Sequence, residues 1–231
     1  WMQETPDSPE ALATIPSLTL EDLEPKIKTI PCEALTLAEM PALYHDLFTN
    51  GIVYLDLGFN LYALPQDYLP YVNLFSRALL ETGTATQDYV KLAQRIGRKT
   101  GGIRPAAFTS ALPNDAAGIA WLFLRGKATV ENTGELLAIL RDVLTTARLD
   151  NRERFRQIVL EEKADQESSL VPAGHAMVSS RLKSRFTTAD WAAEQMGGLE
   201  YLFFLRKLVD QIEQDWPSVQ SALEAMREML L

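Results

Sequence analysis

The sequence predicts an α+β protein, an α/β two-layer arrangement in which an antiparallel sheet packs with helices and a long helical part completes the chain. Three patterns support this class: apolar residues alternate with period two in two regions, they recur with helical spacing between those regions, and the pattern after residue 130 is helical throughout. With 231 residues, 47% hydrophobic and 23% charged, the composition is typical of a globular protein with a sizeable core.

The first 35 residues are expected to form an extended connector. Proline fixes the backbone and removes a hydrogen-bond donor, so repeated prolines interrupt regular structure. The prolines of this segment are Pro6, Pro9, Pro16, Pro25 and Pro31. The sequence therefore divides into a connector at residues 1–35 and a domain at residues 36–231.

A β-hairpin is expected next, with strands at residues 43–48 and 52–59. The segment between them is Thr49-Asn50-Gly51. Asn-Gly between two alternating apolar runs favours a tight turn that joins paired strands.

Two helices follow. Leu69, Val72, Phe75 and Leu79 recur at a spacing near 3.6 and predict an amphipathic helix packed on the sheet. The second helix is expected to begin after Gly83 with Thr86 as its N-cap and to end before the glycine pair at residues 101–102.

Two consecutive antiparallel strands are expected at residues 103–112 and 118–127. Both are rich in branched or aromatic residues, and a Pro-Asn-Asp turn separates them. Trp121 and Phe123 are expected to face the helices.

The remainder is expected to be helical. One apolar stripe includes Leu136 and Leu140, and a following helix would begin with Asp150 and Glu153 as a capping-box pair. Further helices are predicted at residues 172–186, 188–196, 199–214 and 217 to the end.

Charge and cysteine content limit the possible classes of function. A formal net charge of −9 argues against nucleic-acid binding, which relies on clustered Lys and Arg. No apolar stretch approaches the roughly 20 residues that cross a bilayer, so no membrane contact is expected. Cys32 is the one cysteine, so no internal disulfide can form, and a reducing intracellular compartment or organellar lumen is the simplest interpretation.

No catalytic metal site is predicted. A zinc peptidase site places two histidines and a glutamate on one helix, and neither H-x-x-E-H nor a spacing variant of it occurs here. The two histidines, His45 and His175, lie on a predicted strand and after a Pro-Ala-Gly segment, and they are interpreted as ordinary histidines.

Two further motifs are weak. Cys32 lies in the connector, where nothing nearby would lower its pKa and make it a nucleophile. Residues 97–102, GRKTGG, have the composition of a phosphate loop without its spacing, and the end of a helix entering a strand explains them better.

Two charged sets remain. The acidic run could bind a cation, and the basic set could grip a peptide carboxylate, but a solvated helix face and a complement to the helix dipole are the favoured explanations. The acidic run is Glu161, Glu162, Asp165 and Glu167, and the basic set is Arg95, Arg98, Lys99 and Arg104. We therefore predict no catalytic, cofactor-binding or metal-binding residue.

Three segments carry a resemblance to a known family. Residues 3–18 (QETPDSPEALATIPSL), residues 49–57 (TNGIVYLDL) and residues 100–103 (TGGI) resemble the presequence protease family of pitrilysin/insulinase-type zinc metallopeptidases. Members of that family have four related α/β domains in two halves, joined by a helical hairpin and closed around a peptide-sized chamber.

The resemblance implies that residues 3–18 leave that hairpin and that the following domain is the third, at the start of the C-terminal half. It implies a non-catalytic, chamber-forming role in an endopeptidase that degrades short unstructured peptides such as presequences. Zinc would be held by the catalytic N-terminal half, and the partners would be that half, the final domain and peptide substrates. The acidic balance would add a negative field to the chamber.

An alternative from another class of function is an inactive scaffold or assembly subunit of the same fold family. The chain taken alone is also expected to be able to self-associate through apolar faces that other domains would cover.

Overall fold

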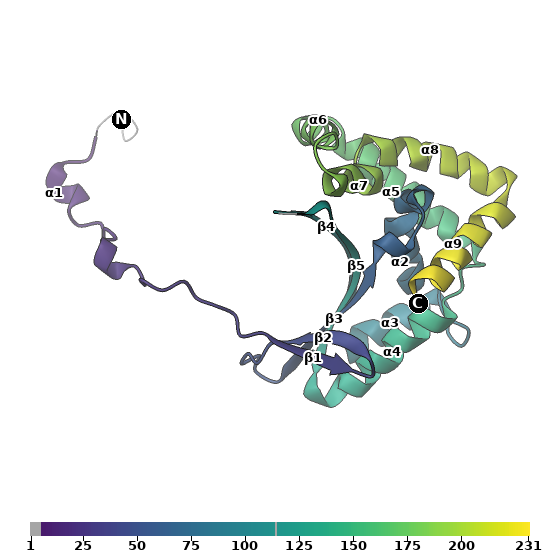
Figure 1. Ribbon diagram of the computed structural model, residues 1–231, viewed down its shortest axis with the longest axis horizontal. Coiled ribbons are helices and arrows are strands. Elements are labelled where there is room, and N and C mark those ends of the chain that lie inside the picture. The colour runs from purple at the N-terminus through teal and green to yellow at the C-terminus, as the bar shows by residue number, and fades with distance from the viewer. Residues whose placement is uncertain (1–5, 114) are drawn as a thin grey trace. The chain divides into compact units, whose positions relative to one another are not determined.

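A computed structural model describes residues 6–113 and 115–231, and its contacts divide the chain into two compact units between Phe48 and Thr49 (Figure 1). Each unit is described by itself below. The predicted division at residues 35 and 36 stays a prediction for the domain boundary, since the strands that begin at Glu33 lie within the first unit. The start of the expected connector, residues 1–5, and the middle residue of the expected Pro-Asn-Asp turn, Asn114, lie outside the described residues.

The first unit consists of short elements without a core of their own. They are α1 (Pro9–Leu12), a 3-10 turn (Leu20–Asp22), β1 (Glu33–Leu37) and β2 (Met40–Tyr44). Strands β1 and β2 pair antiparallel through a two-residue turn, Ala38-Glu39, in which both residues have positive φ. No side chain among residues 6–48 is buried.

The second unit contains one three-stranded sheet and most of the helices. Its strands are β3 (Ile52–Asn60), β4 (Ile103–Leu112) and β5 (Asp115–Thr129). Its helices are α2 (Val72–Glu81), α3 (Tyr89–Lys99), α4 (Thr133–Thr146), α5 (Arg152–Ser169), α6 (Gly174–Lys183), α7 (Thr188–Gly197), α8 (Leu199–Gln214) and α9 (Trp216–Leu230). Short 3-10 turns lie at Leu61–Ala63, Gln66–Tyr71 and Val130–Asn132.

The predicted hairpin across Asn50-Gly51 is wrong. Both residues do have positive φ, as a tight turn requires, but β3 pairs antiparallel with β5, from Ile52 opposite Thr129 to Asn60 opposite Trp121. Strand β2 pairs with β1 instead. The long ladder with β5 satisfies the backbone of β3 over its whole length, and a local turn preference cannot compete with it.

The sheet has the order β3-β5-β4, so β5 is the central strand. In Figure 1 the helices of this unit gather on one side of the sheet. The side chains of β5 that enter the helical core are Leu122, Leu124 and Ala128. Trp121 and Phe123 therefore point to the opposite face, and the prediction that they face the helices is wrong because the alternation along β5 is offset by one residue.

A glycine brings α4 close to the sheet. A Cβ at Gly126 would lie 2.7 Å from Cδ1 of Leu136, which is fully buried. Leu136 occupies the space that a larger residue on β5 would fill, so the predicted stripe of α4 is also the stripe that packs on the sheet.

The helix starts differ from prediction at two caps. Asp88, not Thr86, caps α3, since its carboxylate accepts a hydrogen bond from the Lys91 N–H at 2.9 Å. Asn151, not Asp150, caps α5, and its side chain accepts from the Arg154 N–H at 3.2 Å. In each case a competing polar residue a short distance along the chain has the backbone and reach that capping needs.

The α+β class is confirmed, with an antiparallel sheet packed against helices and a helical C-terminal part. The predicted strand at residues 103–112 and the predicted helix at residues 199–214 agree with β4 and α8. No helix among the described residues is long and apolar enough to span a bilayer.

The alternation along β5 can be tested with two neighbouring substitutions. Leu124→Ala should lower the free energy of unfolding by about 2–5 kcal/mol because it leaves a cavity in the core. Phe123→Ala should lower it by about 1 kcal/mol because Phe123 lies on the other, partly exposed face. Urea denaturation followed by circular dichroism measures both, and a reversed order would show that the strand faces are assigned wrongly.

Candidate functional site

The face of the three-stranded sheet that points away from the helices is the candidate site, and it is called the open face below. Its large or charged side chains come from all three strands. They are Tyr54 and Asp56 of β3, Arg104 and Phe108 of β4, and Trp121, Phe123, Arg125 and Lys127 of β5.

One half of the open face is aromatic. Trp121 and Phe123 stack with ring centroids 6.1 Å apart, and Phe108 lies directly opposite Trp121 in the ladder. A Cβ at Gly58 would lie 2.8 Å from Cε1 of Phe123, so the glycine allows the ring to lie flat across β3. Flat, partly exposed rings offer a stacking surface for an apolar or aromatic group.

The other half is charged. The guanidinium of Arg125 lies 5.4 Å above the Phe123 ring and 3.4 Å from the Asp56 carboxylate. Arg104 stands directly opposite Arg125 in the ladder. The stem of Lys127 packs over Gly101, where a Cβ would come within 2.8 Å of its Cγ.

The open face is therefore locally cationic. Its described side chains include three cations, Arg104, Arg125 and Lys127, against one carboxylate, Asp56. The formal charge of −9 that led us to expect a negative field belongs to the chain as a whole, and this face does not supply it.

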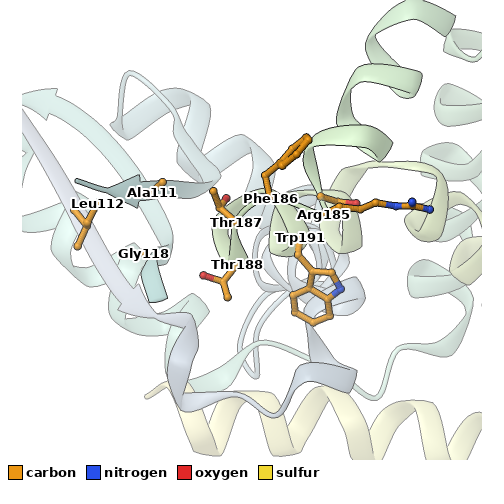
Figure 2. A pocket seen from close by; sticks show the side chains of 9 residues that line it. Ala111, Leu112, Gly118, Arg185, Phe186, Thr187, Thr188 and Trp191 are labelled. Carbon is orange, nitrogen blue, oxygen red and sulfur yellow. The ribbon is translucent and has the colours of Figure 1, made fainter. Parts of the chain in front are cut away.

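A second hollow lies where the end of the β4–β5 ribbon meets the α6–α7 junction (Figure 2). It has a volume of about 440 Å³ and is lined mainly by Leu112, Phe186, Thr187, Thr188 and Trp191. Thr187 is engaged in capping α7, since its hydroxyl accepts from the Asp190 N–H at 3.0 Å. Figure 2 shows Arg185 directed away from the hollow, so the described lining residues offer no convergent set of charged groups.

The two histidines lie in different units. His45 follows β2, and its Nδ1 donates to the carbonyl of Pro31 at 2.8 Å, while His175 lies exposed in the first turn of α6. Within residues 6–113 and 115–231, no three His, Cys, Asp or Glu side chains gather in a way that could hold a metal ion. Cys32 is exposed and precedes β1.

The glycine-rich segment at residues 97–102 joins α3 to β4, as expected. The Gly101 N–H donates to the carbonyl of Lys127 at 2.7 Å, and the Gly102 N–H donates to the Thr100 hydroxyl at 3.0 Å. These N–H groups are engaged within the chain and do not form a phosphate cradle.

The acidic run does more than cover a solvated face. Glu161 and Glu162 lie 2.8 and 3.2 Å from the guanidinium of Arg77, and they tie α5 to α2. Glu167 lies 2.9 Å from Arg206 of α8, and this hydrogen bond, opposed by slight desolvation and helped by Lys163, holds the pKa of Glu167 below its ordinary value. Asp165 is exposed. The run joins helices and is not a cation site.

The basic set divides between the two sides of the sheet. Arg95 lies 2.8 Å from Asp142 and 3.4 Å from Glu135, so it links α3 to α4. Arg98 and Lys99 are exposed in the last turn of α3. Arg104 is the member of the set that reaches the open face, next to residues that the sequence analysis did not select.

A buried carboxylate escaped the sequence analysis as well. Glu194 of α7 is 1% exposed and accepts hydrogen bonds from the Ser180 hydroxyl at 2.7 Å and the Leu199 N–H at 2.9 Å. Arg181 lies 3.6 Å from it. Since Leu199 begins α8 and the preceding Gly198 has no side chain, Glu194 satisfies the start of that helix from the previous one.

Comparison with known proteins adds to this geometry. The chain matches the family model of the peptidase-associated domain of metallopeptidase family 16C over residues 1–208. It is 38% identical over 229 residues to "Presequence protease 1, chloroplastic/mitochondrial" of Arabidopsis thaliana, covering 99% of this chain and 21% of that protein.

Two other relatives agree. Identity is 31% to "Protein HypA" of Clostridium perfringens, covering 99% of this chain and 23% of that protein. It is 27% to "Presequence protease, mitochondrial" of Danio rerio, covering 86% of this chain and 20% of that protein. The chain thus spans about a fifth of the length of these relatives.

These matches define a peptidase-associated domain, and the chain belongs to the family of such domains whose model it matches. Its relatives include presequence proteases, so the resemblance seen in residues 3–18, 49–57 and 100–103 is confirmed at the level of the family.

A structural role for Glu194 predicts a clear contrast with its neighbour Glu200, which also pairs with Arg181 but is 38% exposed in its side chain. Glu194→Ala should lower the free energy of unfolding by about 1–3 kcal/mol because it leaves buried donors unsatisfied. Glu200→Ala should lower it by about 0.5 kcal/mol because exposed ion pairs contribute little. Thermal and urea unfolding measure both, and equal losses would contradict the assignment.

Proposed function

We propose that this chain is a non-catalytic, chamber-forming domain of a zinc metalloendopeptidase that degrades short, unstructured peptides such as targeting presequences. It would be the third domain, at the start of the C-terminal half. The observation that carries the proposal is the open face: a sheet buried on one side by helices and bare on the other, in a chain that spans about a fifth of its relatives.

A chamber wall needs a rigid layer with a solvent-accessible inner surface. The helices behind the sheet supply the rigidity, since Leu122 and Leu124 are buried against them. On the other side, Tyr54 remains 62% and Phe108 45% exposed. Isolated exposed aromatics are common, but several that gather on one sheet face suggest contact with another molecule.

The first unit supports the proposed partners, which are the N-terminal half and the final domain of the same polypeptide. Large apolar side chains along residues 6–48 remain exposed, including Leu18 at 85%, Leu20 at 87% and Ile27 at 91%. A segment this apolar gains free energy when another surface covers it. In the full protein, adjacent domains would provide that surface, and in the isolated chain a second copy could.

The residues of this chain do not fit a zinc ion, because its described His, Cys, Asp and Glu side chains form no group of three or more ligands. Under the proposal, zinc chemistry therefore belongs to the N-terminal half of the full-length protein. What this chain contributes is surface, shape and charge.

The division of labour predicts a simple activity pattern. The full-length protein should cleave an unstructured presequence-type peptide, and a chelator should abolish the activity. The 231-residue chain should show no cleavage with or without added zinc. Mass spectrometry of the digests measures both. Activity in the isolated chain would contradict the proposal, and a full-length protein without chelator-sensitive activity would favour the assembly role instead.

The proposed cover over the first unit can be tested at Cys32, which is exposed in the structure. Maleimide labelling of Cys32 should be fast in the 231-residue chain and at least several-fold slower in the full-length protein. Peptide mass spectrometry reports the modified fraction at this residue, and a dilution series of the isolated chain controls for self-association. Equal rates in the two proteins would contradict the cover.

A further inference from the structure

Three cations on the open face are left with a single carboxylate. Arg125 is paired with Asp56 at 3.4 Å, whereas Arg104 and Lys127 have no carboxylate partner among the described residues. Like charges that stand directly opposite in an antiparallel ladder destabilise it, and Arg104 is directly opposite Arg125. The chain carries 31 acidic residues, so the shortage of carboxylates at this position is local.

The cationic cluster adjoins the aromatic half in a fixed register. Phe123 and Arg125 are two residues apart on β5, so they point to the same face about 7 Å from each other. Residues i and i+2 of an extended peptide are separated by the same distance and also point to one side. A peptide lying on this face can therefore place an apolar ring on Phe123 and a carboxylate between the cations.

The parts of this subsite are held in position. Gly58 makes room for the Phe123 ring, which in turn supports the Arg125 guanidinium from below. Gly101 makes room for the stem of Lys127, whose amine is thereby kept at the same end of the face. Side chains that are already placed lose less entropy when a ligand binds.

We propose that the open face is a binding subsite for extended peptide segments in which an aromatic and an acidic side chain are two positions apart. This inference rests on the proposed chamber role and names a class of peptide that its wall would select. Arg104, Arg125 and Lys127 receive the carboxylate, Trp121 and Phe123 receive the ring, and Asp56 weakens the binding of acidic segments.

A peptide fits these residues better than a single-stranded nucleic acid does. Aromatic rings beside arginines can stack bases, but affinity for a phosphate backbone depends on many cations and a positive field. The open face has three cations around a carboxylate, on a chain of formal charge −9. One carboxylate matches that number, and a run of phosphates does not.

The test uses the 231-residue chain and dye-labelled decapeptides with blocked termini that differ at one residue: Phe-x-Glu, Phe-x-Gln or Phe-x-Lys in a neutral background. Fluorescence anisotropy should give the tightest binding for the Glu peptide. The double variant Arg104→Gln/Lys127→Gln should weaken that binding about threefold to tenfold and leave the Gln peptide unchanged. Asp56→Asn should tighten it by about twofold to threefold, since it removes a repulsive charge and frees Arg125.

A matched control removes two cations from the helical side. Arg141 is 74% exposed in its side chain and Lys207 is exposed on α8, so Arg141→Gln/Lys207→Gln changes the net charge equally. It should leave binding unchanged, and circular dichroism should show all variants folded. Equal binding of the three peptides, or an equal loss in the control, would overturn the subsite, as would a single-stranded oligonucleotide that binds more tightly through the same cations.

This result is separable from the proposed function, because binding needs neither zinc nor the catalytic half. A chain that binds no peptide, within a full-length protein that has chelator-sensitive activity, would overturn the subsite alone.

Discussion

The one-sided burial of β5 is the constraint on which the second unit depends. Leu122, Leu124 and Ala128 are drawn into the helical core, and Gly126 admits Leu136 of α4. Because side chains alternate along a strand, burying this set fixes the direction of Trp121, Phe123, Arg125 and Lys127 at the same time. The ladders then transmit the choice to β3 and β4, so the whole composition of the open face follows from the packing of its reverse.

The same arrangement separates charge between the two sides. On the helical side, carboxylates join neighbouring helices through arginines: Glu161 and Glu162 meet Arg77, and Asp142 meets Arg95. For Arg77, burial alone would lower its pKa, but its carboxylate partners, Glu81 first, raise it above the ordinary value. Acidic residues that serve as helix links are unavailable to the sheet, so an acidic chain presents a cationic face.

How far the sequence predicts this structure depends on how local each feature is. The spacing of apolar residues identified the strand β4 and the helix α8 because each period belongs to one element. The partner of β3 could not be found in the same way, since pairing with β5 joins residues far apart in the sequence and the Asn50-Gly51 turn suggested a nearer partner. The Ala38-Glu39 turn, which does join paired strands, contains neither Asn nor Gly.

The open face was hidden for a related reason. Residues 119–124, IAWLFL, are apolar at every position, so alternation alone cannot decide which half of them is buried. The decision comes from the size of the space beside α4, where aliphatic side chains and a glycine fit and two large rings do not. Once that parity is known, Arg125 and Lys127 can be placed from the sequence by counting, and Arg104 follows from the ladder.

A surface of this kind can serve a reaction without taking part in it. Interactions with parts of a peptide remote from the scissile bond can hold the chain extended and orient the bond that another domain cleaves, and such binding energy can raise the rate of the chemical step. A subsite with few charged contacts suits this task, because each exposed pair contributes little and the product can leave. Three cations restrained by Asp56 meet that requirement better than a fully unopposed cluster would, since too strong a hold on acidic segments would retain the fragments after cleavage.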